Sequence, residues 1–251
     1  MTNILVPISN SGFDPTEVAV PWKILRSVGH TLVFATPDGR RGYADPRMLT
    51  GAGLGIFSSL LRADSNGRMA YEELEKSDEF KNPILYSDID TCNFQALLLP
   101  GGHGRGMKTY LESDVLQSRA IEFFQQGKPV GAICHGVLLA ARSCLSPGRS
   151  IIFGKKTTAL PKLMELGAWS LTCIWLGNYY RTYPKTVEDE VTEFLATPLD
   201  FVKGPAGITR DSPENLDAGF TVLDGLYLSA SWPGDAHRFG VGFARLLSGN
   251  P

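Results

Sequence analysis

The sequence predicts an α/β protein built on an open, doubly wound, mostly parallel sheet with helices on both faces and a nucleophile elbow. Two observations support this fold class. Short apolar runs recur along the chain with helical patterns between them, which is typical of a parallel sheet covered on both sides. In addition, residues 130–133 form an apolar run that ends at Cys134 and His135 and continues at once into a second apolar segment, residues 137–142. A reactive residue therefore stands where a strand turns into a helix.

Strands are predicted wherever a continuous apolar run is too short for a helix. Four such runs occur, at residues 4–8, 31–35, 96–99 and 130–133. Near the end of the chain, residues 220–223 and 226–231 flank an Asp224-Gly225 turn, a pattern that is typical of a hairpin. Because ligands of open parallel sheets bind at the carboxyl ends of the strands, the residues that follow these runs form the candidate site.

Helices are predicted between the strands from apolar residues at helical spacing. Residues 15–28 form one such helix, with Pro15 suited to its first turn and Gly29 to its end. Residues 115–126 repeat the arrangement, and residues 233–247 close the chain with another helix. The alternation of strands and helices is the pattern that a doubly wound sheet requires.

Two stretches do not follow this alternation. Residues 43–83 contain short helical patterns and a cluster of glycines, and residues 171–205 are rich in aromatic side chains. We interpret both as insertions in a single domain that covers residues 1–251. Each insertion is expected to act as a lid or as the contact of a homodimer, or else to be plain peripheral packing.

Composition excludes several classes of function. The chain has 251 residues, 43% hydrophobic and 20% charged, which is ordinary for a globular protein. A formal net charge of −2 without a basic patch argues against nucleic acid as a partner and favours a small molecule. Neither a targeting segment nor an apolar run of bilayer length is visible, so we expect a cytoplasmic protein with no membrane partner. Its four cysteines lack disulfide and zinc spacings, so reduced thiols and no metal are expected.

Cys134 is the candidate nucleophile. A sharp turn from strand to helix holds the residue at the corner in a fixed position, and the neighbouring glycines allow the backbone to pack closely there. The unpaired N–H groups of a helix N-terminus favour a thiolate, so we predict a lowered pKa for this thiol. The alternative is that Cys134 is a small buried apolar residue, as most free cysteines are.

Two further segments are expected to meet Cys134. Glu17 lies in the first turn of the helix after the first strand, so its carboxyl group should reach the sulfur; the alternative is a helix-capping acid. Residues 100–104, Pro-Gly-Gly-His-Gly, follow another strand. There the N–H of Gly102, together with that of His135, is placed to form an oxyanion hole, although such a segment can also be only a turn.

His135 is the candidate general base, because its imidazole adjoins the elbow. Such a base needs an acid that orients it. The downstream candidates are Glu165 and the trio Glu188, Asp189 and Glu190, with surface charge as the alternative for all four.

Several motifs together resemble the ThiJ/PfpI superfamily, whose flavodoxin-like fold is that of class I glutamine amidotransferases. They are Leu-Leu-Pro-Gly-Gly-His-Gly at residues 98–104 and Ala-Ile-Cys-His-Gly at residues 132–136. Phe-Ala-Thr-Pro-Asp-Gly at residues 34–39 and Gly-Lys-Lys-Thr at residues 154–157 resemble the heat-shock chaperone branch, which includes glyoxalase III enzymes. The resemblance covers nearly the whole chain.

The resemblance implies a role for each site residue. Cys134 would be the nucleophile, Glu17 its acidic partner and His135 the acid/base, while Glu165 matches loosely the acid that holds the histidine. The N–H groups of Gly102 and His135 would form the oxyanion hole. His103 and His237 are possible pocket residues, and for His237 helix capping is the alternative, because the segment before it departs from the pattern of the branch.

The function implied is cysteine-dependent conversion of 2-oxoaldehydes such as methylglyoxal to 2-hydroxy acids, a lyase activity that needs neither glutathione nor another cofactor. The same groups serve acyl transfer, so a cysteine amidase or peptidase is one alternative. A second alternative is a stress-response chaperone or redox sensor that turns over no substrate. A class I amidotransferase activity is disfavoured because Arg238 and Phe239 follow His237 in place of the His-x-Glu of that class.

Overall fold

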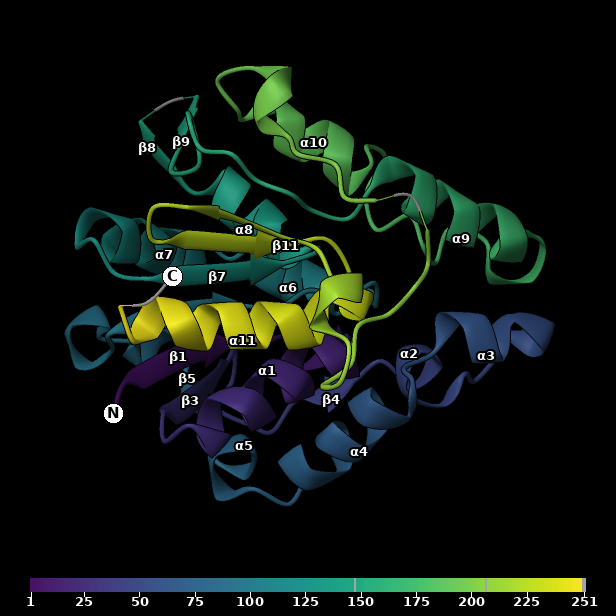
Figure 1. The fold of residues 1–251 in the computed structure, drawn as a ribbon, viewed down its shortest axis with the longest axis horizontal. Coiled ribbons are helices and arrows are strands. Elements are labelled where there is room, and N and C mark those ends of the chain that lie inside the picture. Colours follow the sequence, from purple (N-terminus) through teal and green to yellow (C-terminus); the bar gives the residue numbers. More distant parts are fainter. Residues whose placement is uncertain (147, 206, 250–251) are drawn as a thin grey trace.

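The structure is a computed structural model that describes residues 1–146, 148–205 and 207–249. Its centre is a seven-stranded sheet with the order β10-β11-β7-β6-β1-β3-β5 (Figure 1). The strands are β1 (Asn3–Pro7), β3 (Thr31–Thr36), β5 (Ile84–Leu85), β6 (Ala96–Leu99), β7 (Val130–Ile133), β10 (Thr221–Asp224) and β11 (Tyr227–Ala230). All pairs are parallel except β10 with β11, which form the predicted hairpin. The mostly parallel sheet is therefore confirmed.

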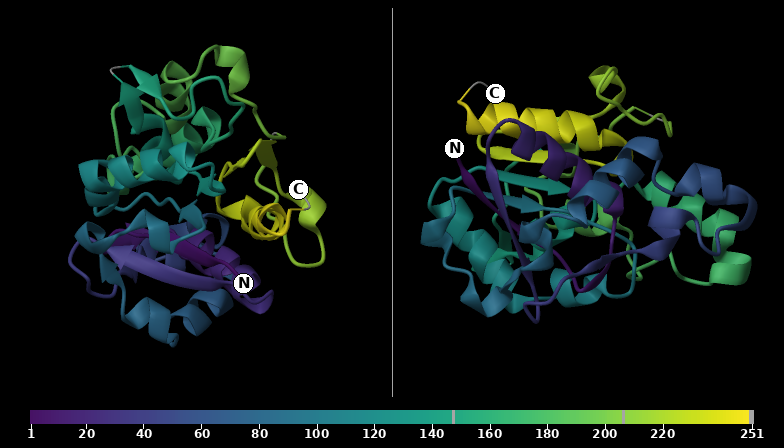
Figure 2. Two further views of the ribbon diagram at one scale, coloured as in Figure 1. Left: turned by 90° about the vertical axis from the view of Figure 1, so that its left-hand side faces the viewer. Right: turned by 90° about the horizontal axis from the view of Figure 1, so that it is seen from below.

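Helices cover both faces of the sheet, as the alternating pattern predicts. Figure 2 shows α1 and α11 on one face and α6, α7 and α8 on the other. Their bounds are α1 (Pro15–Ser27), α6 (Met107–Leu111), α7 (Asp114–Gln125), α8 (Gly136–Arg142) and α11 (Ala236–Leu247). Because both faces are covered, β6 and β7 are buried along their whole length, which explains their continuous apolar sequences.

The ends of the predicted helices agree closely with the structure. Helix α1 begins at Pro15 after Asp14, whose side chain accepts hydrogen bonds from the first free N–H groups, and Gly29 follows the helix with a φ of 87°. Helix α7 begins at Asp114 after a Ser113 cap. The closing helix differs, since its first turn, η6 (Pro233–Asp235), is a 3₁₀ turn that precedes α11.

The register of the central strands brings their carboxyl ends together. Leu99 at the end of β6 pairs with Ala132 of β7, and Ile133 at the end of β7 pairs with Ala230 of β11. The loops after β1, β6 and β7 therefore leave the sheet at one edge. This edge contains the segments that the sequence analysis selected as the candidate site.

The two segments interpreted as insertions fold mainly into short helices. Residues 43–83 contain β4 (Tyr43–Ala44), which pairs with β2 (Ser11–Phe13), and then α2 (Pro46–Thr50), η1 (Gly55–Phe57), α3 (Ser58–Leu61), α4 (Ser65–Leu74) and α5 (Asp78–Lys81). Residues 171–205 contain the end of α9 (Lys162–Leu176), then α10 (Val187–Glu193) and η4 (Pro198–Asp200). A hairpin of β8 (Cys144–Ser146) and β9 (Arg149–Ser150) and three 3₁₀ turns complete the chain: η2 (Tyr86–Asp88), η3 (Thr91–Asn93) and η5 (Leu216–Ala218).

Helix α9 packs against the first of these segments. The Trp175 indole N–H donates to the carbonyl of Gly53 at 2.8 Å, and the Trp175 ring stacks on Phe57 with 6.2 Å between centroids. A small apolar cluster of Met48, Leu54 and Tyr180 lies beneath this contact. The two segments therefore form one cap at the carboxyl edge of the sheet. In the described parts of the chain, every helix falls short of the length and apolarity needed to span a bilayer.

Candidate active site

Cys134 occupies a strained elbow between β7 and α8. Its φ is 77°, and it is the one non-glycine residue with positive φ among those described. The left-handed conformation costs about 1–2 kcal/mol for a residue with a Cβ. The turn is also tightly packed, because a Cβ on Gly136 would lie 2.0 Å from the carbonyl oxygen of Leu99. Strain of this kind is retained where a side chain must be held in one position. The predicted sharp turn from strand to helix at Cys134 is confirmed.

Glu17 directs its carboxyl group toward this elbow. Its side chain is fully buried, and Oε2 accepts a hydrogen bond from the N–H of Gly101 at 2.8 Å. The cap of α1 is Asp14, whose Oδ1 accepts from the N–H groups of Thr16 at 2.8 Å and of Glu17 at 3.1 Å. Glu17 is therefore not needed as the capping acid, and its carboxyl group lies near enough to Cys134 to raise the pKa of the thiol.

Burial determines the protonation of the Glu17 carboxyl group and of the Cys134 thiol. It raises the pKa of Glu17 well above its ordinary value, and neighbouring Asp14 raises it further. Burial also raises the pKa of the Cys134 thiol well above its ordinary value; Glu17 adds to the shift, and the N–H of His135 opposes it. The predicted lowering of the thiol pKa is wrong, because desolvation beside an acid outweighs the N-terminus of a seven-residue helix.

His135 places a neutral imidazole next to the sulfur. Its Nδ1 lies 3.6 Å from Cys134 Sγ, and its side chain is fully buried. Burial lowers the pKa of this imidazole well below its ordinary value, and His103 and Arg142 lower it further. Nε2 has no hydrogen-bond partner within the described chain. The ring is therefore uncharged near neutral pH and has a nitrogen available for a proton.

His103 packs against His135 and separates it from the cap. The two rings meet edge to face with 4.7 Å between centroids, and His103 meets Tyr180 in the same way at 5.1 Å. Burial lowers the pKa of His103 to about 4, so this imidazole is also neutral. His103 lines the cavity described below.

The two N–H groups predicted for an oxyanion hole are free of backbone partners. Within the described residues, neither the N–H of Gly102 nor that of His135 donates to a backbone carbonyl. Glycine is required at both positions before His103: a Cβ on Gly101 would lie 2.6 Å from the nitrogen of His135, and one on Gly102 would lie 2.6 Å from the carbonyl oxygen of Gly12. The loop after β6 therefore packs closely against the elbow at Gly101 and against the segment before α1 at Gly102.

Glu165 does not pair with His135. It lies in the first turn of α9, where Oε2 accepts from the N–H of Val187 at 2.9 Å and Oε1 lies 3.5 Å from Nε of Arg181. Burial raises the pKa of this carboxyl group to about 7. The expected orientation of His135 by Glu165 is therefore replaced by a contact that joins α9 to the start of α10.

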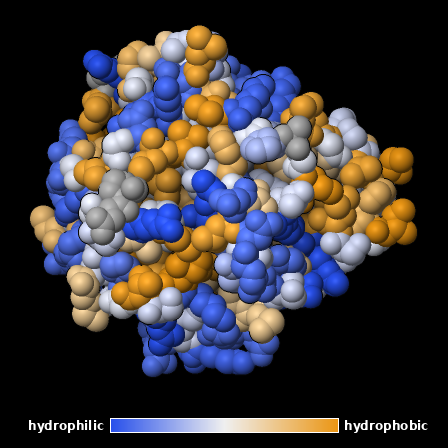
Figure 3. All heavy atoms as spheres, viewed as in Figure 1, coloured by the Kyte–Doolittle hydropathy of each residue, from blue (hydrophilic) through white to orange (hydrophobic). Residues whose placement is uncertain are grey.

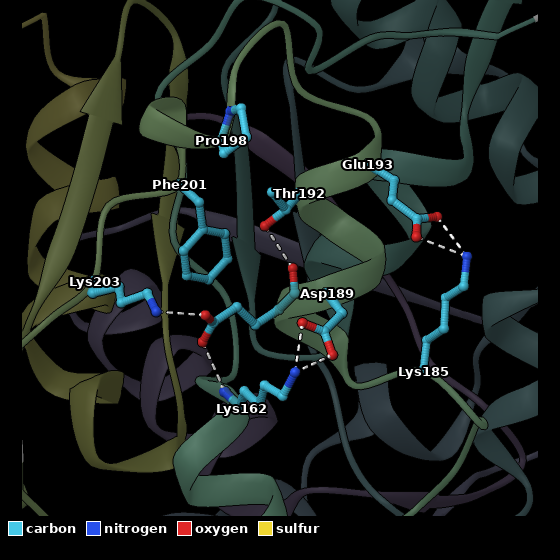
Figure 4. A pocket seen from close by; sticks show the side chains of 9 residues that line it. Lys162, Lys185, Asp189, Thr192, Glu193, Pro198, Phe201 and Lys203 are labelled. Atoms are coloured by element: carbon cyan, nitrogen blue, oxygen red, sulfur yellow. Dashed lines mark hydrogen bonds and ion pairs between the residues drawn. The ribbon is translucent and has the colours of Figure 1, made fainter.

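The other candidate acids make ion pairs with neighbouring basic groups. Glu190 pairs with Arg142 at 2.7 Å, and Asp189 pairs with Lys162 at 2.9 Å. The latter pair belongs to a charged hollow of about 620 Å³ between the start of α9, α10 and η4, which Figure 4 shows from close by. Lys203 and Glu188 form another pair there, at 2.7 Å. Cys134, His135, Glu17 and Glu165 are not among the residues that line this hollow.

His237 serves a structural role at the start of α11. Its Nδ1 lies 3.1 Å from Oδ1 of Asp211, and the same carboxyl group accepts from the N–H groups of His237 at 3.2 Å and of Arg238 at 2.7 Å. The acid that caps these N–H groups is therefore Asp211, and the His237 ring contacts its carboxyl group without capping the helix itself. His237 is not among the lining residues of the cavity beside the elbow.

A cavity of about 290 Å³ lies between the elbow and the cap. Asp14, His103 and Tyr180 line it from buried positions, and Arg210 and Trp232 line it from partly buried ones. The sequence analysis did not identify Asp14, Tyr180 or Arg210 as site residues. Asp14 stands before a helix and the other two lie in turns or loops, whose paths are set by tertiary packing. No three His, Cys, Asp or Glu side chains in the described chain are grouped as metal ligands would be.

Comparison with known proteins agrees with this geometry. The chain is 25% identical over 235 residues to glutathione-independent glyoxalase hsp3102 of Schizosaccharomyces pombe, covering 90% of this chain and 85% of that protein. It is 25% identical over 231 residues to glyoxalase 3 of Candida albicans, with the same coverage. The crystal structure of Candida albicans glyoxalase III has a TM-score of 0.65 at 21% identity, covering 98% of this chain and 97% of that one.

The family follows from a direct match. Residues 8–198 match the model of a family described as ThiJ/PfpI family-like. This region contains the elbow, the loop after β6 and the first turn of α1, and thus every residue that the structure places around the sulfur. The chain belongs to the ThiJ/PfpI-like family.

Proposed function

We propose that this protein is a glutathione-independent glyoxalase that converts 2-oxoaldehydes to 2-hydroxy acids at Cys134. One observation carries the proposal: the buried thiol at the elbow lies 3.6 Å from a neutral imidazole, with the Glu17 carboxyl group as its other polar neighbour. The glyoxalase names of relatives that align over most of the chain support it.

The first step is addition of the thiol to the aldehyde. Because burial keeps Cys134 protonated near neutral pH, the His135 imidazole takes the proton as the S–C bond forms. The oxygen of the former carbonyl gains negative charge, which the N–H groups of Gly102 and His135 stabilise. Return of the proton to this oxygen gives a hemithioacetal and restores the neutral imidazole.

The second step moves one proton between the two carbons. His135 removes the proton from the carbon bound to sulfur, and the electron pair passes to the adjacent ketone. Delivery of the proton to that second carbon, together with transfer of the hydroxyl proton from the oxygen on the first carbon to the oxygen on the second, gives a thioester of the 2-hydroxy acid. Protonated Glu17 can donate to oxygen or sulfur during the transfer, since its pKa is raised. Water then cleaves the thioester, so the net reaction consumes one water and needs no redox partner.

The burial of the site favours small substrates. Cys134 is 1% exposed and does not itself line the cavity, so a substrate must pass His103 to reach the sulfur. A folded protein or a peptide bond within a chain has no such access in this conformation. This argues for a small aldehyde over the peptidase alternative.

The experiment that separates the reaction classes supplies the protein with methylglyoxal without glutathione, and in parallel with glutamine and a small aryl amide. Lactate is quantified in the first reaction, and ammonia or free amine in the others. The proposal expects lactate from methylglyoxal and no amide hydrolysis above that of buffer. Amide hydrolysis without lactate would assign the site to acyl transfer instead.

Exposed apolar side chains favour a second candidate function, the holding of unfolded proteins. Ile56 is 88% exposed and Ile174 92%, both on the cap, and Leu163 in the first turn of α9 is 84% exposed. Suppression of heat-induced aggregation of a client protein would test it, with Ile174→Asp expected to weaken the effect. Equal suppression by Ile174→Asp and by the unaltered protein would argue against this surface as the client site.

A further inference from the structure

We infer that the cavity beside the elbow selects 2-oxoaldehydes that carry an aryl or branched alkyl group over methylglyoxal, and that Gly167 keeps room for this group. The inference rests on the proposed function, because it assigns a substrate class to the same site. It is carried by the polarity of the cavity, by its size and by the position of one glycine.

The polar lining of the cavity is buried and adjoins the elbow. Asp14, His103 and Tyr180 are 3%, 8% and 2% exposed, and His103 contacts the catalytic His135. Asp14 also lies close enough to Glu17 to raise its pKa. Buried Glu165 and half-buried Arg210 also line the cavity, and Arg210 lies close enough to Asp14 to lower the pKa of that carboxyl group. The polar neighbours available to the dicarbonyl end of a substrate are therefore buried or half-buried side chains.

The outer lining is apolar and open to solvent. Leu60 and Leu171 are each 41% exposed, Ile208 is 59% exposed and Leu163 is 84% exposed. Figure 3 shows apolar residues gathered at the right-hand end of the molecule, where Figure 1 places α3 and α9. A substrate with an apolar group would remove this surface from water, whereas methylglyoxal offers one methyl group.

The size of the cavity leads to the same conclusion. Its volume of about 290 Å³ is close to the lower end of the range, about 300 Å³, of sites that hold drug-sized ligands. Methylglyoxal has three carbons and two oxygens, so it fills only a small part of this space. An aryl ring attached to the same dicarbonyl group would extend from the inner end to the apolar mouth.

Gly167 is unusual because neither packing nor backbone conformation requires a glycine there. It lies in the interior of α9 (Lys162–Leu176), where glycine is disfavoured relative to alanine. A Cβ at this position would meet no atom within 4 Å, and its φ is not in the left-handed region. Gly167 also lines the cavity. A side chain there would extend into open space at the wall, so its absence leaves room for a substrate group.

The test compares phenylglyoxal with methylglyoxal in the unaltered protein and three variants. The quantity measured is the ratio of the two kcat/KM values, each normalised to the reactivity of that aldehyde with a free thiol. Gly167→Phe places a ring at the cavity wall, and Gly167→Ala adds only a methyl group. Ile174→Phe is the matched control, because it adds the same ring to the same helix at a residue that is 92% exposed and does not line the cavity.

We expect the unaltered protein to favour phenylglyoxal by about tenfold or more, the selectivity that an apolar pocket provides. Gly167→Phe should lower the ratio at least tenfold, Gly167→Ala by less than threefold, and Ile174→Phe should leave it within twofold. If all four proteins turn over both aldehydes and the normalised ratio of the two kcat/KM values is the same in each, the inference is wrong and the glyoxalase function stands. If the unaltered protein turns over neither aldehyde, the proposed function fails and the inference fails with it.

Discussion

Cys134 Sγ lies 3.6 Å from Nδ1 of His135, the residue that follows it in the sequence. This contact exists because the left-handed φ of Cys134, 77°, turns the backbone sharply between β7 and α8. The proposed nucleophile and the proposed base thus come from adjacent residues, and the strained elbow holds their side chains together. The third group, Glu17, comes from the first turn of α1 and is held there by the N–H of Gly101.

The raised pKa of Cys134 predicts slow alkylation at neutral pH. Only the thiolate reacts with iodoacetamide, and burial keeps the thiol protonated, so the rate at Cys134 should increase about tenfold per pH unit from pH 7 to pH 9. Mass spectrometry of the peptide that contains Cys134 measures this rate, and exposed Cys92 serves as an internal reference. A rate that levels off below pH 7 would show a lowered pKa and would contradict the account.

Replacement of the Glu17 carboxyl group should shift this profile. Glu17→Gln keeps a side-chain oxygen that can accept from the N–H of Gly101, but it removes the carboxyl group that raises the pKa of the thiol. We therefore expect the alkylation profile of Cys134 to move to lower pH in the variant. Identical profiles for the two proteins would mean that Glu17 does not act on the sulfur electrostatically.

Gly136 at the tightly packed elbow and Gly167 in open space on α9 predict opposite effects of alanine substitution on the free energy of unfolding. Gly136→Ala places a Cβ 2.0 Å from the carbonyl oxygen of Leu99, a backbone atom that cannot move away without disturbing β6. We expect a loss of about 3 kcal/mol or more in the free energy of unfolding. Gly167→Ala, in open space within α9, should raise it by about 1 kcal/mol. Urea denaturation measures both, and equal effects would contradict the packing described.

The position of His103 predicts that it limits access to the sulfur. His103→Ala removes the ring that packs on His135 and lines the cavity. A bulky maleimide should then modify Cys134 at least about tenfold faster, relative to Cys92 in the same protein, because the wall between cavity and elbow is gone. An unchanged relative rate would show that the reagent reaches the sulfur by another path.

The environment of Glu165 predicts a pH-dependent stability. Its pKa is raised from an ordinary value of 4.5 to about 7, so the folded state holds the proton more tightly than the unfolded state does. The resulting stabilisation is fully present below about pH 4.5 and is lost as the pH rises through 7. Between pH 5 and pH 8 the unaltered protein should lose about 2–3 kcal/mol of unfolding free energy relative to Glu165→Gln.

The same variant tests the role of this acid in catalysis. Because the Glu165 carboxyl group binds the N–H of Val187 and Arg181, we expect kcat of Glu165→Gln to decrease by less than tenfold. A decrease of a thousandfold, with an altered pH profile of kcat, would show that Glu165 orients His135 during turnover. Equal pH dependence of stability in the two proteins would in turn contradict the raised pKa.

The sequence was sufficient to predict the sheet, its covering helices and the elbow, because continuous apolar runs and a Cys-His-Gly corner are local signals. It also placed Glu17 and Gly102 at the correct edge, since the carboxyl ends of parallel strands meet there. The pKa of Cys134 could not be predicted, because it depends on burial and on the Glu17 carboxyl group rather than on the helix that follows. The partners of Glu165 depend on how α9 meets α10, which no local pattern specifies.

Local sequence patterns could not predict the cavity for a similar reason. Its wall combines α9 with residues from α2 and α3, and these elements meet only through tertiary contacts such as Trp175 with Gly53. Asp14 appeared in the sequence as an ordinary residue before a helix. Only its burial, which raises its pKa to about 6, marks it as a member of the site.

The most direct test of the central claim is the amount of lactate formed from methylglyoxal without glutathione by the unaltered protein and by Cys134→Ala at equal concentration. The account predicts one lactate per methylglyoxal consumed, at a rate reduced at least about a thousandfold in Cys134→Ala. Circular dichroism and urea denaturation would establish that the variant is folded. Equal lactate formation by the two proteins, or none by either, would contradict the claim that the Cys134 thiol performs this reaction.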